Sequence, residues 1–166
     1  MALTEGMDAT GTGSGADDGA LADIARHHGR MLERASALAE AILAAVEAGD
    51  PPLAHEEKDA LVSWCEDELI PHFQAEEGSL YAGARATGEG RLLVEGLLLD
   101  HEAMAGHVEE LRAAEGLRAA ALAAAIARAF ALHRAKEDAL LYPLIAGSQE
   151  LSLAEASRGL ETLVGP

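Results

Sequence analysis

Two ten-residue segments of this 166-residue chain share a pattern of side chains that can bind metal ions. The first, HFQAEEGSLY, begins at His72, and the second, HRAKEDALLY, begins at His133. Each segment places a glutamate, Glu76 or Glu137, four residues after its histidine. Residues four apart lie on the same face of a helix, so each segment presents a nitrogen ligand beside an oxygen ligand. This combination of donors suits iron, manganese or zinc.

Two further histidines, His28 and His101, fall within apolar stripes that predict the inward faces of two other helices. A polar side chain that is buried without a partner costs several kcal/mol, so four such histidines favour a common partner. Each half of the chain supplies one histidine on one helix and an HxxxE pair on the next, and a four-helix bundle brings these faces to one axis. The sequence therefore predicts one polar pocket with two metal ions bridged by two carboxylates. Its expected ligands are His28, His72, Glu76, His101, His133 and Glu137.

The helices that must position these residues are predicted from apolar periodicity and from helix-ending Gly and Pro residues. No useful length of sequence alternates with period two, so we expect no strands. Short connections between long helices force neighbours to be antiparallel, which predicts an all-α, up-down-up-down four-helix bundle with a short C-terminal helix. Pro71 should bend or loosen the second helix just before His72. The predicted helices span residues 20–48, 53–82, 91–114 and 117–146, with a short one over 151–163.

Length, composition and charge favour one soluble domain. Residues 1–19 are mostly Gly, Thr, Ser and Asp and are expected to be disordered, which leaves 20–166 as the metal-binding domain. The formal net charge of −17 argues against nucleic acid and anionic membranes as partners. The single cysteine, Cys65, excludes a disulfide framework and a thiolate zinc cluster. Because we find no signal peptide and no apolar stretch long enough to span a membrane, we expect a cytoplasmic protein.

Four segments of the chain resemble the hemerythrin-like, or HHE cation-binding, family of non-heme diiron helical bundles. They are IARHHGRML, IPHFQAEEGSLY, LLLDHEAMAGHVEEL and LHRAKEDALLYPLI, and together they cover roughly residues 20–146. The resemblance implies that the six residues of the polar pocket bind two iron ions. It also implies that Glu76 and Glu137 bridge the ions, with an oxo or hydroxo group as the third bridge. Manganese and zinc accept the same ligands and stay open as alternatives.

The adjacent histidines His27 and His28 are alternative candidates for the first ligand. Aligning RHHGRM with LDHEAM places His28 opposite His101, with a methionine three residues later in each segment. This alignment favours His28 as the ligand and matches His27 with Asp100.

The chain differs from the oxygen-carrying hemerythrins at two positions. Those proteins have a fifth histidine where this chain has Ala105, and they place the last carboxylate five residues after its histidine. Here Glu137 stands at four and Asp138 at five. The resemblance therefore implies a more symmetric site, with two histidines per iron and an open position on each iron for oxygen, nitric oxide or peroxide. Ferritin-like diiron proteins are disfavoured, because no histidine here follows an acidic residue by three positions.

Three functions remain open from the sequence. The first is a metal-binding protein whose diiron centre binds or senses oxygen, nitric oxide or iron itself. The second is a diiron redox enzyme that acts on peroxide or nitric oxide, and the third is an acidic helical interaction protein without metal. We expect a small diatomic or peroxide ligand and a monomer or weak dimer, while the sequence identifies no protein partner. His55 is expected at the surface and outside any site.

The residues near the expected ligands have simpler expected roles. Glu77 and Asp138 follow the ligand carboxylates and should form ion pairs or hydrogen bonds to the ligands. Tyr81 and Tyr142 occupy matched positions in the two segments and should pack in the core with the hydroxyl toward a polar neighbour. Cys65 should be a small core residue.

Overall fold

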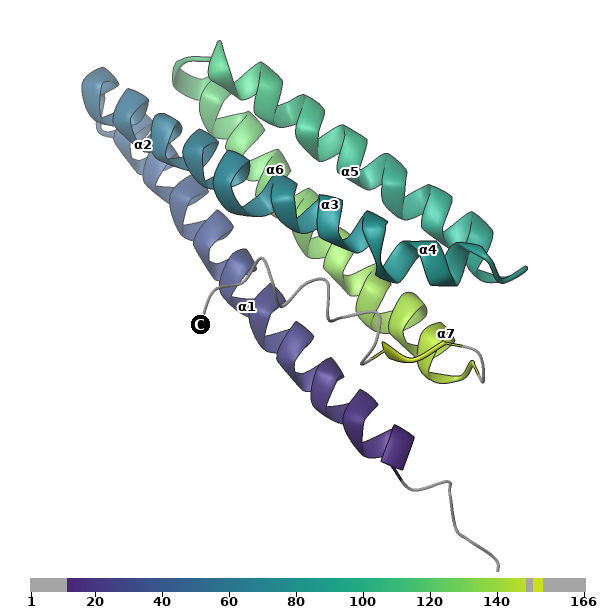
Figure 1. The fold of residues 1–166 in the computed structure, drawn as a ribbon. Helices are drawn as coiled ribbons and strands as arrows, with labels where there is room; N and C mark the ends of the chain where they lie inside the picture. Colours follow the sequence, from purple (N-terminus) through teal and green to yellow (C-terminus); the bar gives the residue numbers. More distant parts are fainter. Residues whose placement is uncertain (1–11, 149–150, 154–166) are drawn as a thin grey trace, which may run out of the picture.

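The computed structural model describes residues 12–148 and 151–153, with backbone only for residues 12–14 and 16, and these form four helical rods. The rods run alternately up and down (Figure 1), and no strand occurs in the part of the chain that is described. The expected all-α, up-down-up-down four-helix bundle is thereby confirmed. The first rod is α1 (Thr12–Glu47), and the third is α5 (Gly90–Arg112). The second rod consists of α2 (Pro51–Trp64), η1 (Cys65–Leu69), α3 (Ile70–Gly78) and α4 (Leu80–Arg85). The fourth rod consists of α6 (Gly116–Lys136), η2 (Glu137–Leu141) and α7 (Tyr142–Ala146).

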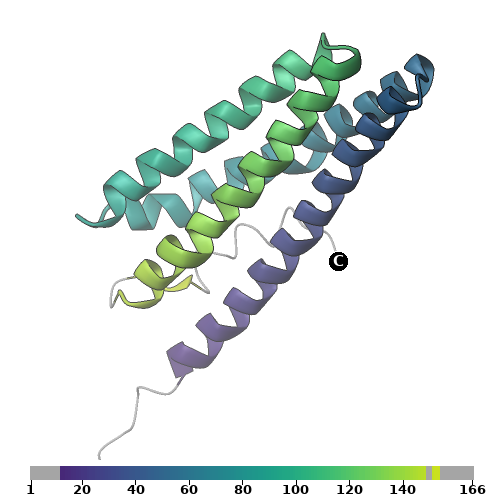
Figure 2. The same cartoon turned by 180° about the vertical axis from the view of Figure 1, so that it is seen from behind.

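Short turns set the antiparallel order of the rods, which is visible from both sides of the bundle (Figures 1 and 2). The backbone φ of Gly49, which follows the end of α1, is 67°, and that of Gly116, the first residue of α6, is 56°. Glycine adopts this left-handed conformation without strain, which allows the chain to turn at both places. Asp50 then caps α2 by accepting a hydrogen bond from the backbone N–H of Leu53 at 3.1 Å. α1 packs against α2 and α6, and α5 packs against α6 and α4.

The apolar interior is divided into two clusters, and a polar layer lies between them. One cluster fills the part of the bundle near the α1–α2 and α5–α6 turns, and the other fills the opposite end. On every rod the predicted ligands therefore lie between an apolar residue of one cluster and an apolar residue of the other. The flanking pairs are Ile24 and Met31, Leu69 and Leu80, Leu97 and Met104, and Phe130 and Leu141.

Two π-helical turns, η1 and η2, interrupt the second and fourth rods, and each is followed by a proline, Pro71 or Pro143. Proline lacks an N–H, and its ring would clash with the carbonyl four residues earlier in a regular helix. In each turn the N–H of the residue before the proline bonds five residues back, to the carbonyl of Cys65 or of Glu137. The predicted loosening before His72 is confirmed, whereas the second π-helical turn was not predicted.

The first helix begins at Thr12, which is earlier than the sequence indicated. The disorder expected for residues 1–19 is therefore wrong for 12–19. A tertiary contact stabilises this extension: the Asp17 carboxylate accepts a hydrogen bond from the Ser152 hydroxyl at 3.3 Å. A sequence window that is rich in glycine gives no sign of such contacts.

The second rod also ends differently from the prediction. It breaks at Ser79 and continues as α4 to Arg85, so the expected loop over 83–90 is shorter. The helical end persists because Tyr81 and Ala84 are buried in the second cluster. The tail over 1–11 and all but the first three residues of the expected helix 151–163 lie outside the described residues.

One continuous stretch, Gly116–Ala146, is long and apolar enough to cross a membrane by length and composition alone. The prediction that no apolar stretch is long enough to span a membrane is therefore wrong by this criterion. A single helix of this kind is weak evidence for a membrane span, because core helices of bundles have the same composition. This stretch also places His133 and Glu137, both buried, in the bundle interior.

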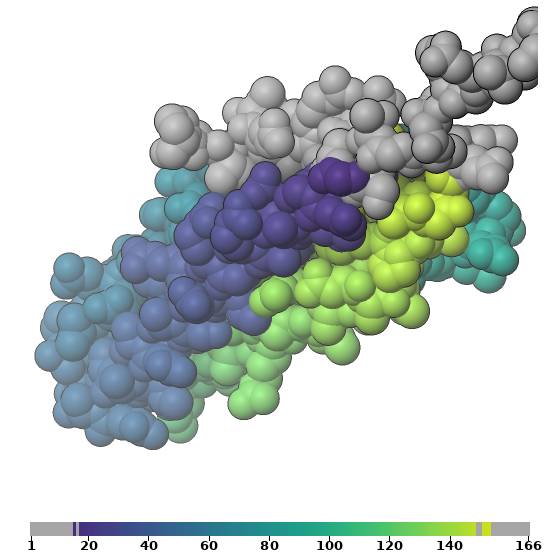
Figure 3. Space-filling model, turned by 90° about the horizontal axis from the view of Figure 1, so that it is seen from below, coloured from purple at the N-terminus to yellow at the C-terminus, as the bar shows by residue number. Residues whose placement is uncertain are grey.

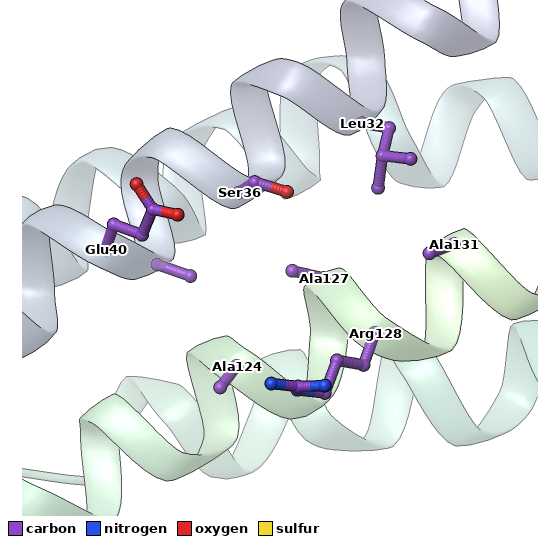
Figure 4. Close-up of a pocket in the computed structure, with 8 residues that line it drawn as sticks. Leu32, Ser36, Glu40, Ala124, Ala127, Arg128 and Ala131 are labelled. Carbon is purple, nitrogen blue, oxygen red and sulfur yellow. The ribbon is translucent and has the colours of Figure 1, made fainter.

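α1 lies beside the fourth rod along one face of the molecule (Figure 3). Between these two helices is an open groove of about 290 Å³ (Figure 4). It is lined by Leu32, Ser36, Ala39, Glu40, Ala124, Ala127, Arg128 and Ala131. None of the predicted ligands lines this groove, so it is separate from the polar layer.

Candidate metal centre

All six predicted ligands are buried and meet in the polar layer, with at least one contributed by each rod. The most exposed of them are His72 and His101, each only 4 % exposed. Their burial follows from the helical spacing, because each ligand continues the apolar stripe of its own helix. The predicted convergence of side chains therefore occurs in the folded chain.

The first group of possible ligands contains His28, His72 and Glu76. The Nε2 atoms of His28 and His72 lie 3.1 Å apart. The Oε1 atom of Glu76 lies 3.0 Å from Nε2 of His72 and 3.4 Å from Nε2 of His28. These donors from α1 and α3 lie close enough together to bind one metal ion.

The second group contains Glu76 again, with His101 and His133. The two histidine Nε2 atoms lie 3.1 Å apart, and Oε2 of Glu76 lies 3.5 Å from that of His101 and 3.9 Å from that of His133. Each group therefore takes a different oxygen of the same carboxylate. Glu76 has the geometry of a bridge between two cations.

Glu137 also faces both groups, with Oε2 3.9 Å from Nε2 of His28 and Oε1 3.7 Å from Nε2 of His133. Unlike Glu76, it accepts two hydrogen bonds from tyrosines. The Tyr81 hydroxyl donates to Oε1 at 2.7 Å, and the Tyr142 hydroxyl donates to Oε2 at 3.3 Å. The polar neighbour expected for the two tyrosine hydroxyls is thus a single carboxylate.

The pKa values of the two carboxylates are shifted in opposite directions. Burial would raise the pKa of Glu76, but the surrounding imidazoles, His72 first, hold it well below its usual value. Burial and then the negative charge of Glu76 raise the pKa of Glu137 well above its usual value. Two ionised carboxylates repel each other at this buried site, and cations between them would stabilise both in the ionised form.

Two of the histidines are held from outside by acidic side chains. Nδ1 of His101 lies 2.8 Å from a carboxylate oxygen of Glu77, and Nδ1 of His133 lies 3.3 Å from one of Asp100. The hydrogen bond expected of Glu77 is confirmed, whereas Asp100 was considered only as the counterpart of His27. The sequence could have indicated a supporting role for Asp100, because this residue directly precedes the ligand His101 and so lies at the edge of the inward face of its helix.

The donors fit a metal ion better than they fit one another. A neutral imidazole that donates from Nδ1 to a carboxylate has a bare lone pair on Nε2, and in His101 and His133 two such lone pairs face each other at 3.1 Å. Both oxygens of Glu76 are buried and make no hydrogen bond. Buried polar atoms are normally paired, so this arrangement is the one that cations would complete.

The structure separates His28 from its neighbour His27. His28 is fully buried, and His27 is partly exposed and belongs to neither group of possible ligands. The His27 ring centroid lies 5.1 Å from that of His72, and its Nε2 is buried without a hydrogen-bond partner. Burial, followed by the neighbouring His72, lowers the pKa of His27 to about 4. The geometry thus favours His28, as the alignment did.

Three other residues lie outside the centre. His55 is exposed, with its ring nitrogens near surface carboxylates. Asp138 pairs with Arg134 at 3.2 Å, which fulfils the ion-pair alternative expected for it. Cys65 is fully buried in the apolar core, and burial raises the pKa of its thiol to about 12.

Comparison with known families agrees with this geometry. Neither the curated proteins nor the solved structures include a match to the chain. A family model described as the hemerythrin HHE cation binding domain matches residues 19–145, which contain all four rods except the first turns of α1 and the last residue of α7. The chain therefore belongs to the hemerythrin family of HHE cation-binding domains.

Proposed function

We propose that this protein binds two iron ions in a carboxylate-bridged non-heme centre that binds or senses oxygen, nitric oxide or iron itself. The observation that carries the proposal is the division of Glu76, whose two oxygens each face one pair of histidines. A shared carboxylate between two nitrogen pairs supplies nitrogen and oxygen donors that suit two borderline metal ions.

Each part of the chain has a defined role in this proposal. His28 and His72 would hold one ion, and His101 and His133 would hold the other, with Glu76 between them. Glu137 would add a second bridge and is oriented by the two tyrosines. When bound, the iron pair supplies redox chemistry and open coordination positions for a small ligand.

The decisive experiment is metal analysis of aerobically purified protein together with its absorption spectrum. We expect about two irons per chain, with charge-transfer bands in the near ultraviolet. His72→Ala or Glu137→Ala should lower the iron content sharply, and His55→Ala should leave it unchanged. Equal loss in all three variants, or no bound metal in the wild-type protein, contradicts the proposal. Manganese or zinc bound at the same stoichiometry would support the proposed ligands but contradict iron as the metal.

The choice of first ligand has its own test. His28→Ala should lose iron because the His28 Nε2 lies 3.4 Å from the shared carboxylate, while His27→Ala should retain nearly all of it. The opposite result would move the ligand to His27.

A second candidate function is a diiron enzyme that acts on peroxide or nitric oxide. It is favoured by the Tyr81 hydroxyl, which lies 3.4 Å from Nε2 of His101 and 3.3 Å from Nε2 of His133. This buried hydroxyl donates its one hydrogen to Glu137, and it can donate instead to a small oxygen-containing ligand if that bond is exchanged. Turnover of peroxide or nitric oxide well above that of free iron, and reduced in Tyr81→Phe, would support the enzyme. Ligand-dependent spectral change without turnover would support a binder or sensor.

A further inference from the structure

The two groups of histidines are supported unequally from outside, although the two Nε2 atoms lie 3.1 Å apart in each group. Both ligand histidines of the second group, His101 and His133, have Nδ1 within hydrogen-bond distance of a carboxylate. In the first group, Nδ1 of His28 is buried without a partner. Within the described part of the chain, no residue hydrogen-bonds Nδ1 of His72 either.

The internal repeat shows which residues of the first group correspond to the supporting carboxylates of the second group. Asp100, which lies beside His133, corresponds in the repeat to His27, which lies beside His72. The first group therefore has a partly buried imidazole where the second group has a carboxylate.

The counterpart of the other supporting carboxylate, Glu77, is a carboxylate that makes a different contact. Glu77, which supports His101, corresponds to Asp138, and this aspartate pairs with Arg134 and leaves His28 unsupported. Each support present in the second group thus has an identifiable, altered counterpart in the first.

A carboxylate that accepts from Nδ1 fixes the ring orientation and raises the electron density on Nε2, and this strengthens the bond from Nε2 to a metal. His101 is held further by its neighbours: Phe73 stacks on it with a centroid distance of 4.0 Å, and Tyr81 stacks on it at 5.5 Å. Little reorganisation of this ring is therefore needed when a metal binds.

We propose that the two metal positions are unequal, and that Glu77 and Asp100 are positioning residues that make the His101–His133 position the tighter one. The metal at the His28–His72 position is then the exchangeable one. This inference rests on the proposed two-metal function and adds an order of filling and release to it.

The two supports are themselves unequal. The Asp100 carboxylate also accepts hydrogen bonds from Nζ of Lys136 at 2.7 and 2.8 Å, and its contact with His133 is 3.3 Å long. A neighbouring cation withdraws charge from a carboxylate and makes it a weaker acceptor. Among the described residues no cation pairs with Glu77, which lies closer to its histidine, at 2.8 Å. Glu77 should therefore contribute more than Asp100.

The test measures iron release instead of activity. The full-length protein, loaded without oxygen with two equivalents of Fe²⁺, is mixed with a chromogenic iron(II) chelator. We expect two phases of equal amplitude. His72→Gln should retain only the slow phase and His133→Gln only the fast phase.

Variants of the supporting residues then test the cause. Glu77→Gln should speed the slow phase by about 10- to 100-fold and Asp100→Asn by less, with the fast phase unchanged. Glu102→Gln is the matched control and should change neither phase, because it alters an exposed glutamate on α5, the helix that carries Asp100 and His101. His27→Asp should place a carboxylate beside His72 and slow the fast phase.

The outcomes separate this inference from the proposed function. A wild-type protein that binds no metal overturns both. Two irons released in a single phase leave the proposed function standing and overturn the inference. A slow phase that is unchanged in Glu77→Gln, or that is accelerated equally in Glu102→Gln, also overturns it, as does a His27→Asp fast phase that keeps the wild-type rate. Far-ultraviolet circular dichroism confirms that each variant is folded.

Discussion

Lys58 on α2 is a buried cation far from the metal centre, and its substitution should destabilise the fold without affecting metal binding. The residue is only 2 % exposed, and its Nζ donates to the backbone carbonyls of Arg112 at 3.2 Å and Ala114 at 3.5 Å. α5 ends at Arg112, and the last carbonyls of a helix lack partners within the helix. Lys58 therefore caps α5 from another rod, where its charge also suits the negative end of the helix dipole.

The magnitude follows from these contacts. A hydrogen bond from a charged donor contributes about 1.5–3 kcal/mol, and the longer contact to Ala114 contributes at the low end or below. The ion pair with Glu115 at 3.1 Å adds little, because that carboxylate is 65 % exposed. Lys58→Met, which keeps the length of the aliphatic stem, should therefore lower the free energy of unfolding by about 2–3 kcal/mol. For a chain of this size that corresponds to a fall in Tm of roughly 4–12 °C.

Thermal unfolding followed by circular dichroism measures this change, with Glu115→Gln as the matched control. The control removes only the exposed contacts of that carboxylate with Lys58 and His55 and should cost no more than about 0.5 kcal/mol. Iron content should be unchanged in both variants, because Lys58 lies fourteen residues before His72, or about 21 Å along the rod. A Lys58→Met protein as stable as the wild type, or a control that loses as much, would refute the capping role.

Three further outcomes follow from the structure. Because it is fully buried and its pKa is raised to about 12, the Cys65 thiol should react with a disulfide reagent at pH 8 only when urea unfolds the chain, and rapid reaction of the native protein would contradict its core position. Tyr81→Phe removes the 2.7 Å hydrogen bond to Glu137 and should destabilise the metal-free protein by about 1–3 kcal/mol in urea titrations; an unchanged midpoint would exclude that bond as a stabilising one. Phe130→Ala empties a fully buried position and should cost about 3–5 kcal/mol, whereas Leu132→Ala, at a residue 60 % exposed, should change stability by less than about 0.5 kcal/mol; equal costs would mean that the two side chains are not buried as described.

The sequence by itself determined which side chains reach the polar layer. Helical spacing fixes the face on which a residue lies, so His72 and Glu76 had to point together, and an apolar stripe around His28 or His101 had to turn that histidine inward. The same local reasoning predicted the loosening of the helix before Pro71. These features depend only on residues within one or two turns of each other.

Local spacing did not determine how the two copies of the HxxxE segment would differ. The first copy is broken at Ser79, and the second contains a π-helical turn that starts at Glu137. An extra residue in one turn rotates every later side chain relative to a regular helix. Tyr81 and Tyr142, which are matched in sequence, therefore reach the same carboxylate from different directions.

Only the tertiary structure decided which carboxylate is shared and which histidines are supported. These contacts join residues on different rods, and they depend on the rotation and axial shift of each helix against its neighbours, which packing of the two apolar clusters sets. Glu76 faces both pairs of histidines, and Asp100 reaches His133, because α3, α5 and α6 come together at one height. A repeat that looks symmetric along the chain thus folds into two unequal halves, since each half packs against different neighbours.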